Sequence, residues 1–163
     1  MNLADPPGVK TIAVETAREM LYAVENSLPV DAAIFAAAVA DWRVREQQRQ
    51  KIKKTGGKIA DLALTENPDI LAAIAKRGSK RPKLVIGFAA ETENVVRNAK
   101  TKLAAKGCDW ILANDVSPQT GIMGGDRNTI HFITAAAAES WPPKSKDEVA
   151  KTLIARIADA LAK

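Results

Sequence analysis

Apolar and polar residues alternate in blocks along the chain, and the spacing inside each block predicts its secondary structure. Three largely apolar runs have the length of strands and the composition of strands covered on both faces: residues 32–39, 83–89 and 110–113. A shorter run at 9–14 follows a Pro-Pro-Gly loop and predicts a further strand. Residues 62–64 predict a short strand, and residues 122–134 predict a loop or hairpin that leads into a strand.

Helical spacing separates these strands. Residues 16–28 place apolar side chains on one face, and Thr16 and Glu19 form a capping-box pattern at their start. Asn67 and Pro68 are typical of an N-cap and a first helical position. Residues 93–106 predict a helix that ends at Gly107. A last helix is predicted from Ser145, with apolar residues every fourth position: Val149, Leu153, Ile157 and Leu161.

Strands and helices thus alternate, with a polar stretch at residues 43–50 that is expected to be a loop. This order predicts an α/β fold, Rossmann-like, with a mainly parallel sheet, helices on both faces and a small β excursion. We expect one domain over residues 1–163.

Composition narrows the class of protein. Hydrophobic residues make up 47% and charged residues 26%, which is typical of a soluble globular domain, and no apolar run reaches the ~18 residues of a membrane span. The net charge of +5 favours an anionic partner, but the basic residues are scattered, which disfavours nucleic acid. A single cysteine, Cys108, excludes an internal disulfide and predicts a cytoplasmic protein. One histidine, His131, and one cysteine cannot build a His/Cys zinc site, and His131 is expected to face outward on a strand.

Polar side chains follow the three apolar runs. Asp41, Glu91 and the pair Asn114-Asp115 stand at their carboxyl ends, and such ends share one edge of a parallel sheet, where ligands bind. A polar loop follows Asp41, which favours a functional role. For Glu91 a helix cap and a functional role are equally open.

Basic groups supply a second signal. Lys51, Lys53 and Lys54 are the densest positive charge, and Lys102 and Lys106 share one helix face. Each group alone is more typical of a solvated surface than of an anion site. Neither the dinucleotide nor the P-loop glycine motif occurs, so the residues by themselves predict only a domain that binds a phosphorylated ligand at its strand ends.

Several segments together resemble the phosphopantothenoylcysteine synthetase family, the synthetase half of a bifunctional bacterial enzyme of coenzyme A biosynthesis. They follow the family's order and spacing over nearly the whole chain: residues 36–43, Lys51-Ile52-Lys53-Lys54, residues 67–71, Gly87-Phe88-Ala89-Ala90-Glu91-Thr92, residues 113–117 and Asp126-Arg127-Asn128.

The resemblance implies a two-step ligation. The carboxylate of 4'-phosphopantothenate attacks the α-phosphate of CTP, giving an acyl-cytidylate and pyrophosphate, and the amine of cysteine then displaces CMP. The enzyme must offset the triphosphate charge with lysines and Mg²⁺ and keep the intermediate from water. The family is dimeric, with the strand after Asn128 as a candidate dimer element. A fused decarboxylase domain belongs to the full-length protein, and no FMN is expected here.

The resemblance also implies site residues. Asp41 and Lys51 match the nucleotide-site aspartate and lysine and are the expected catalytic pair, with metal ligands left open. The other positions that match nucleotide contacts are Phe35, Ala36, Ala37, Pro68, Asp69, Ile70, Leu71, Phe88, Lys102 and Lys106.

The sequence departs from the family at its start, because the family's domain opens with a Gly-Thr-rich βα segment that this chain lacks. We therefore expect an N-terminally truncated synthetase domain with an exposed sheet edge, reduced stability or association, and little or no complete ligation. A nucleotide- or phosphate-binding module without catalysis is the alternative, and an oxidoreductase is disfavoured because the glycine motif is missing.

Overall fold

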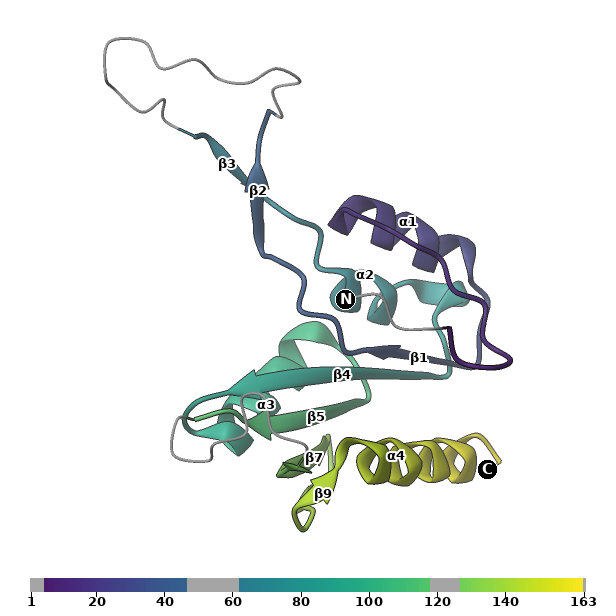
Figure 1. Ribbon diagram of the computed structural model, residues 1–163, viewed down its shortest axis with the longest axis vertical. Coiled ribbons are helices and arrows are strands. Elements are labelled where there is room, and N and C mark those ends of the chain that lie inside the picture. The colour runs from purple at the N-terminus through teal and green to yellow at the C-terminus, as the bar shows by residue number, and fades with distance from the viewer. Residues whose placement is uncertain (1–4, 47–61, 118–126, 163) are drawn as a thin grey trace. The chain divides into compact units, whose positions relative to one another are not determined.

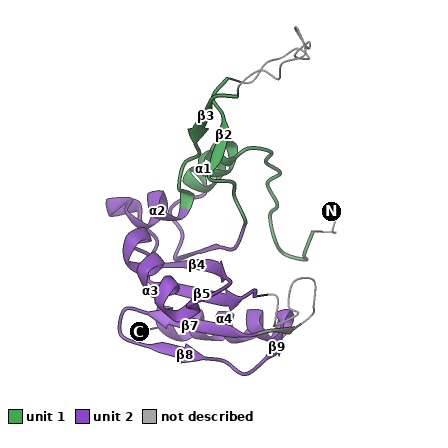
Figure 2. Ribbon diagram, turned by 90° about the vertical axis from the view of Figure 1, so that its left-hand side faces the viewer, with its two compact units in different colours: residues 1–26, 38–70 green, residues 27–37, 71–163 purple. Residues whose placement is uncertain are grey.

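The computed structural model describes residues 5–46, 62–117 and 127–162, and the chain groups into two compact units (Figure 2). Unit 1 comprises residues 1–26 and 38–70, and unit 2 comprises residues 27–37 and 71–163. The description of residues 1–163 as one domain stays a prediction. None of the helices in the described segments has the length and apolar character needed to cross a bilayer.

Unit 2 contains a five-stranded sheet in the order β1-β4-β5-β7-β8, of which Figure 1 labels the first four strands and Figure 2 labels β8. Its strands are β1 (Ala32–Phe35), β4 (Leu84–Glu91), β5 (Trp110–Asp115), β7 (Ile130–Thr134) and β8 (Ala138–Ser140). The pairs β1–β4 and β4–β5 are parallel, while β7 runs antiparallel to both β5 and β8. Four of the five strands therefore point the same way, and the prediction of a mainly parallel sheet is confirmed.

Helices cover both faces of this sheet, because residues alternate between faces along each strand. On one face, Val85 of β4 packs in a cluster with Leu103 of α3 (Val95–Lys106). On the other face, Ile86 packs in a second cluster with Leu153 of α4 (Lys146–Leu161). The predicted Rossmann-like arrangement, with helices on both faces, is confirmed.

The ends of α3 and α4 follow the residues that predicted them. Gly107 ends α3 in the left-handed region at φ 73°, and its N–H donates to the carbonyl of Leu103 over 3.0 Å. At the start of α4, Ser145 and Glu148 form a capping box, with each side chain accepting from the other residue's backbone N–H at 3.2 and 2.7 Å. Val149, Leu153 and Ile157 are buried as predicted, with 7% exposure or less.

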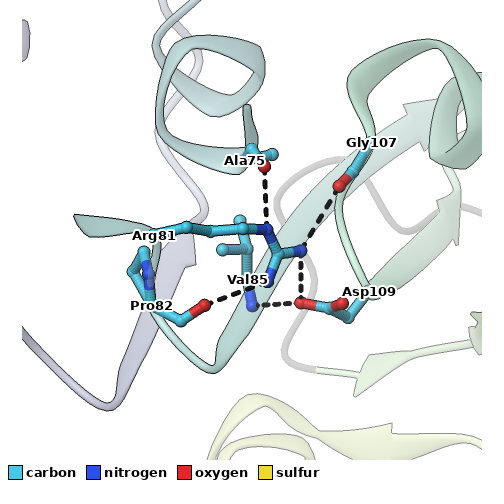
Figure 3. Close-up of polar contacts among 6 residues, drawn as sticks. All are labelled: Ala75, Arg81, Pro82, Val85, Gly107 and Asp109. Atoms are coloured by element: carbon cyan, nitrogen blue, oxygen red, sulfur yellow. Dashed lines mark hydrogen bonds and ion pairs between the residues drawn. The ribbon is translucent and has the colours of Figure 1, made fainter. Parts of the chain in front are cut away.

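Arg81 and Asp109 brace the amino end of the sheet in unit 2 (Figure 3). Nη2 of Arg81 lies 2.8 Å from Oδ2 of Asp109, and Nε donates to the carbonyl of Ala75 over 2.8 Å. The same Asp109 oxygen accepts the backbone N–H of Val85 at 2.7 Å. One guanidinium and one carboxylate thereby join the end of α2 (Ile70–Ala75), the start of β4 and the loop before β5.

Unit 1 is built from α1 (Ala17–Asn26) and a two-stranded sheet. The sheet pairs β2 (Trp42–Val44) with β3 (Leu64–Glu66) in antiparallel register, Trp42 opposite Glu66. The predicted box before α1 is present, because Glu19 N–H donates to Thr16 and the Glu19 carboxylate accepts the Thr16 N–H.

Smaller elements complete the chain. A 3₁₀ turn (Gly78–Lys80) precedes β4, and β6 (Arg127–Asn128) pairs antiparallel with β9 (Lys144–Ser145).

Three boundary predictions are wrong. Residues 9–14 form no strand, and Val9 and Ile12 are 58% and 51% exposed, because an apolar run becomes a strand only where a partner satisfies its backbone groups. The strand predicted over 32–39 ends at Phe35, where its pairing with β4 stops. Residues 43 and 44, expected within a loop, instead belong to β2.

The strand after Asn128 was also the candidate dimer element. This strand, β7, is paired on both edges, and Ile130, Phe132 and Ile133 are buried within unit 2. The homodimer and the role of this strand in it both stay predictions.

Candidate functional site

The carboxyl ends of β4 and β5 bring two predicted acidic residues together. In the parallel register Glu91 lies opposite Asp115, and Ala90 lies opposite Asn114. Both carboxylates fall on the α3 face, since they continue the alternation that places Ala89 and Ala113 there. The prediction of a shared polar edge holds for these strands, whereas Asp41 belongs to unit 1.

Glu91 is held by side chains of α3. Nζ of Lys102 lies 2.6 Å from its Oε1, and Nδ2 of Asn98 donates to Oε2 over 3.3 Å. Only 12% of the Glu91 side chain is exposed, against 46% for Lys102. No side chain caps the start of α3 at Asn94, so Glu91 is an ion-pair partner and not a helix cap. Of the two roles left open for Glu91, the helix cap is therefore excluded.

Asp115 is held as an anion by the loop that follows it. The Ser117 N–H donates to Oδ1 of Asp115 over 2.9 Å. Hydrogen bonds from the Ser117 hydroxyl and N–H, with a smaller effect of the nearby His131, keep the pKa of Asp115 below its usual value. Its neighbour Asn114 has a buried side-chain oxygen that accepts no hydrogen bond within the described part of the chain.

His131 and Cys108 have structural surroundings. His131 is half-buried on β7, and its Nδ1 lies 2.8 Å from the hydroxyl of Ser140 on β8. Cys108 is buried before β5, and desolvation raises the pKa of its thiol. Residues 5–46, 62–117 and 127–162 contain no cluster of three or more His, Cys, Asp or Glu that could hold a metal ion.

The predicted lysine pair does lie on one face of α3, four residues apart. Lys102 already has an acidic partner in Glu91, so the repulsion between the lysines does not by itself require an external anion. Lys106 is half-buried in the last turn. Sequence reasoning missed the link to Glu91, although a strand-ending acid followed by a helix with lysine on its inner face is a readable signal.

The predicted aromatic contacts lie on opposite faces of the sheet. Phe35, at the end of β1, packs with the α3-side cluster, whereas Phe88 of β4 packs with the α4-side cluster. Ala36 and Ala37 follow β1 and are exposed. Phe35 pairs in register with Gly87, so the two aromatic residues are neighbours along the ladder without sharing a surface.

In unit 1, Asn67 ties Asp41 to the segment before α2. The Asn67 N–H donates to the Asp41 carbonyl and its side-chain amide to the Ala40 carbonyl, both over 2.8 Å. The side-chain amide of Asn67 thus bonds to the segment before β2, and α2 begins at Ile70, later than Pro68, the predicted first helical position. Asp41 and Asp69 are exposed and Pro68 is half-buried. The structure thus brings the predicted residues Asp41 and Pro68 near each other.

The remaining predicted contacts have core positions or lie outside the described residues. Ile70 is 6% exposed. A Cβ on Gly87 would meet Cδ2 of Leu71 at 2.7 Å, so Leu71 fills the space that this glycine leaves. Lys51, together with Lys53, Lys54 and Asp126, lies outside the described residues.

Known proteins resemble this chain along almost all of its length. The family model for the DNA/pantothenate metabolism flavoprotein C-terminal domain matches residues 1–161. The coenzyme A biosynthesis bifunctional protein CoaBC of Haemophilus influenzae is 40% identical over 158 residues, which is 96% of this chain and 39% of that protein. CoaBC of Escherichia coli K12 is 38% identical over 160 residues, with the same coverage. The chain thus spans about two fifths of these relatives.

Solved structures agree with these matches. The crystal structure of the C-terminal domain of CoaBC has a TM-score of 0.73 at 32% identity, covering 98% of this chain and 72% of that one. A DNA/pantothenate metabolism flavoprotein from Streptococcus pneumoniae shares the fold, with a TM-score of 0.77 at 17% identity, covering 98% and 77%. Family model, sequence and fold point to one group, and the chain belongs to the family of the DNA/pantothenate metabolism flavoprotein C-terminal domain.

Proposed function

We propose that this chain carries the synthetase chemistry of coenzyme A biosynthesis, the CTP-dependent joining of 4'-phosphopantothenate and cysteine. The observation that carries the proposal is the 32% identity to the CoaBC C-terminal domain over 98% of this chain. A more distant structure of the same fold is the Cab2 H337A variant in complex with phosphopantothenate-cysteine, with a TM-score of 0.57 at 16% identity. That compound is the product of the proposed reaction after loss of the nucleotide.

The chemistry requires activation of a carboxylate, which is a poor electrophile at neutral pH. A carboxylate oxygen of 4'-phosphopantothenate attacks the α-phosphorus of CTP, and the bond to pyrophosphate breaks. The cysteine amine then attacks the acyl carbon, loses a proton and expels CMP. The protein must offset negative charge on the triphosphate and position two substrates in turn.

The proposed site consists of lysines, a catalytic pair and further nucleotide contacts. Lys51, Lys102 and Lys106 would offset the triphosphate charge, and Asp41 and Lys51 are the proposed catalytic pair. The remaining nucleotide contacts are proposed at Phe35, Ala36, Ala37, Pro68, Asp69, Ile70, Leu71 and Phe88. In support, Lys102, Ala36, Ala37 and Asp41 are all exposed.

Mg²⁺ fits the available oxygen donors. This ion is commonly held by one or two carboxylates together with substrate phosphates, and the exposed Asp41 carboxylate suits such a shared arrangement. When bound, Mg²⁺ would neutralise charge on the triphosphate as the α-phosphorus is attacked. Asp41 is the residue proposed to hold it.

Partners and setting follow from the same proposal. A homodimer, a decarboxylase domain fused in the full-length protein and a cytoplasmic location are proposed. No FMN site is proposed in this chain.

The test is a product assay with a binding assay beside it. Purified protein with CTP·Mg²⁺, 4'-phosphopantothenate and cysteine is assayed for pyrophosphate, CMP and phosphopantothenoylcysteine, and we expect at most a small amount of product, in line with the expectation of little or no complete ligation. Thermal stabilisation by CTP·Mg²⁺ should exceed that by ATP, NAD or FMN. CTP binding without product would favour the binding module, and no preference among these compounds would reject the proposal.

Lys51 provides a sharper check of the nucleotide assignment. Lys51→Gln should weaken CTP binding about tenfold or more, because loss of one charge-assisted contact to phosphate is worth about 1.5–3 kcal/mol. Lys83→Gln, which removes a 73% exposed lysine beside Asp31, is the matched control and should leave binding unchanged. Equal affinity of the Lys51 variant and the unaltered protein would remove Lys51 from the site.

A further inference from the structure

Lys102 has a defined partner before any ligand is considered. Its ammonium group lies 2.6 Å from Oε1 of Glu91, at the point where β4 ends. The second carboxylate oxygen, Oε2, accepts from Asn98, one turn earlier on the same face of α3. The Asn98 amide also donates to the Glu93 carbonyl over 2.9 Å, which fixes the amide in place.

The two ends of this ion pair have unequal surroundings. Glu91 is 12% exposed, whereas Lys102 is 46% exposed. An ammonium group has three N–H donors, and the contact of Lys102 with Oε1 of Glu91 is an ion pair, since this oxygen accepts no hydrogen bond within the described part of the chain. The buried carboxylate therefore anchors the lysine from the protein side, while much of the lysine side chain remains open to solvent.

We propose that Glu91 is a positioning residue that orients the Lys102 ammonium toward a nucleotide phosphate. This inference rests on the proposed function, in which Lys102 contacts CTP. Asn98 holds Glu91, the Glu91 carboxylate holds the Lys102 ammonium group by charge, and the N–H groups of Lys102 are available to phosphate oxygens. A lysine side chain fixed in this way loses less conformational entropy when the anion binds.

In a different arrangement, Glu91 would compete with the nucleotide phosphate for Lys102. If the lysine had to leave Glu91 to reach phosphate, removal of the carboxylate would tighten nucleotide binding. The positioning role predicts the opposite sign. The sign of one affinity change therefore separates the two arrangements.

The experiment is a double-mutant cycle in CTP·Mg²⁺ binding by isothermal titration. Glu91→Gln keeps the shape of the side chain and removes its charge, and it should raise the Kd about five- to tenfold, as loss of about 1 kcal/mol of orientation implies. In the Lys102→Gln background the same change should have no further effect. Glu91→Asp, which keeps the charge, should recover part of the affinity.

Asp31→Asn is the matched control. It removes the acidic partner of Lys83, an ion pair of 3.1 Å at the opposite end of the sheet with both side chains at least 70% exposed. It should leave the Kd unchanged. Circular dichroism and the thermal midpoint of each variant separate loss of binding from loss of fold, and Glu91→Asp keeps the test usable if Glu91→Gln does not fold.

Several results would overturn the inference. These are an unchanged or lower Kd for Glu91→Gln, or an equal effect with and without Lys102. If the unaltered protein binds no CTP, the proposed function fails and this inference fails with it. If the unaltered protein binds CTP and the cycle is additive, only the role of Glu91 is lost.

Discussion

Individual carboxylates in this molecule make distinct interactions, which their positions explain. Glu91 pairs with a lysine, Asp115 is held by Ser117, and Asp109 joins Arg81 to a backbone N–H. All three flank strands β4 and β5, yet only the first lies beside a predicted ligand contact. The residue type and its place next to a strand do not distinguish these roles, because the partners of Glu91 and Asp109 come from separate segments.

Asp109 should be the most important of the three for stability. Asp109→Ala removes a charge-assisted bond to Arg81 and leaves the Val85 N–H without its acceptor, so we expect a loss of about 1.5–3 kcal/mol in the free energy of unfolding. Urea denaturation measures it. Asp31→Ala, which breaks an exposed pair, should cost no more than about 1 kcal/mol. Equal losses would show that the Arg81–Asp109 pair stabilises the fold no more than an exposed ion pair does.

The lowered pKa of Asp115 predicts that its contribution to the stability of the fold is lost in acid. Its folded pKa lies below the usual 3.8, so its contribution to stability is present above that value and is lost as the pH falls through the folded pKa. Ser117→Ala removes the hydroxyl that lowers this pKa most, and the pKa should move back toward 3.8. Carboxyl NMR titration measures the change. A pKa that stays in place would assign the effect to the backbone N–H instead.

The helices and strands show which sequence signals are decisive. The boundaries of α3 and α4 follow from Gly107 and from the Ser145–Glu148 box, since these signals act within a few residues. Residues 9–14 had the composition of a strand but pair with no described strand, and Pro68, predicted as the first helical residue, precedes the start of α2 at Ile70. Local signals were readable, whereas pairing depends on segments that sequence spacing does not bring together.

The end of α3 offers a test of one local signal. Gly107→Ala should cost about 1–2 kcal/mol, because φ 73° is unfavourable for a residue with a Cβ. The nearest atom to that Cβ would be Cε of Lys76 at 3.6 Å, so the cost comes from the backbone and not from a clash. Gly107→Asn should cost less, since asparagine tolerates this conformation better. Thermal unfolding of both variants measures the difference, and equal costs would reject the backbone explanation.

At the scale of the whole molecule, only part of the site could be predicted from the sequence. The sheet, its direction and the edge shared by Glu91 and Asp115 could be anticipated from apolar runs and their polar ends. The predicted contacts divide between the two units, with Asp41 and Pro68 in unit 1 and Phe88 and Lys102 in unit 2. Lys51 lies outside the described residues, so its role depends on the binding experiments.

The outer edge of β1 should influence association. Within the described residues β1 pairs with β4 alone, and Ile34 on this edge strand is 43% exposed. Apolar edge strands favour contacts between molecules, and a lysine on the edge opposes them. Ile34→Lys should therefore reduce concentration-dependent association in light scattering, whereas Ile154→Lys on the exposed side of α4 should change it less. Equal behaviour of the two variants would exclude the edge as the cause.

The short ladder of β1 has a kinetic consequence for the residues beyond it. Only four residues of β1 pair with β4, whereas β4 and β5 share six pairs in the middle of the sheet. Local opening should therefore detach β1 before the central strands separate, so amide hydrogens at Phe35 and its neighbours should exchange with solvent through a low-energy opening. Ala36 and Ala37 directly follow this strand, so a ligand that contacts them would have to suppress its fluctuations, and part of its binding energy would be spent on that ordering.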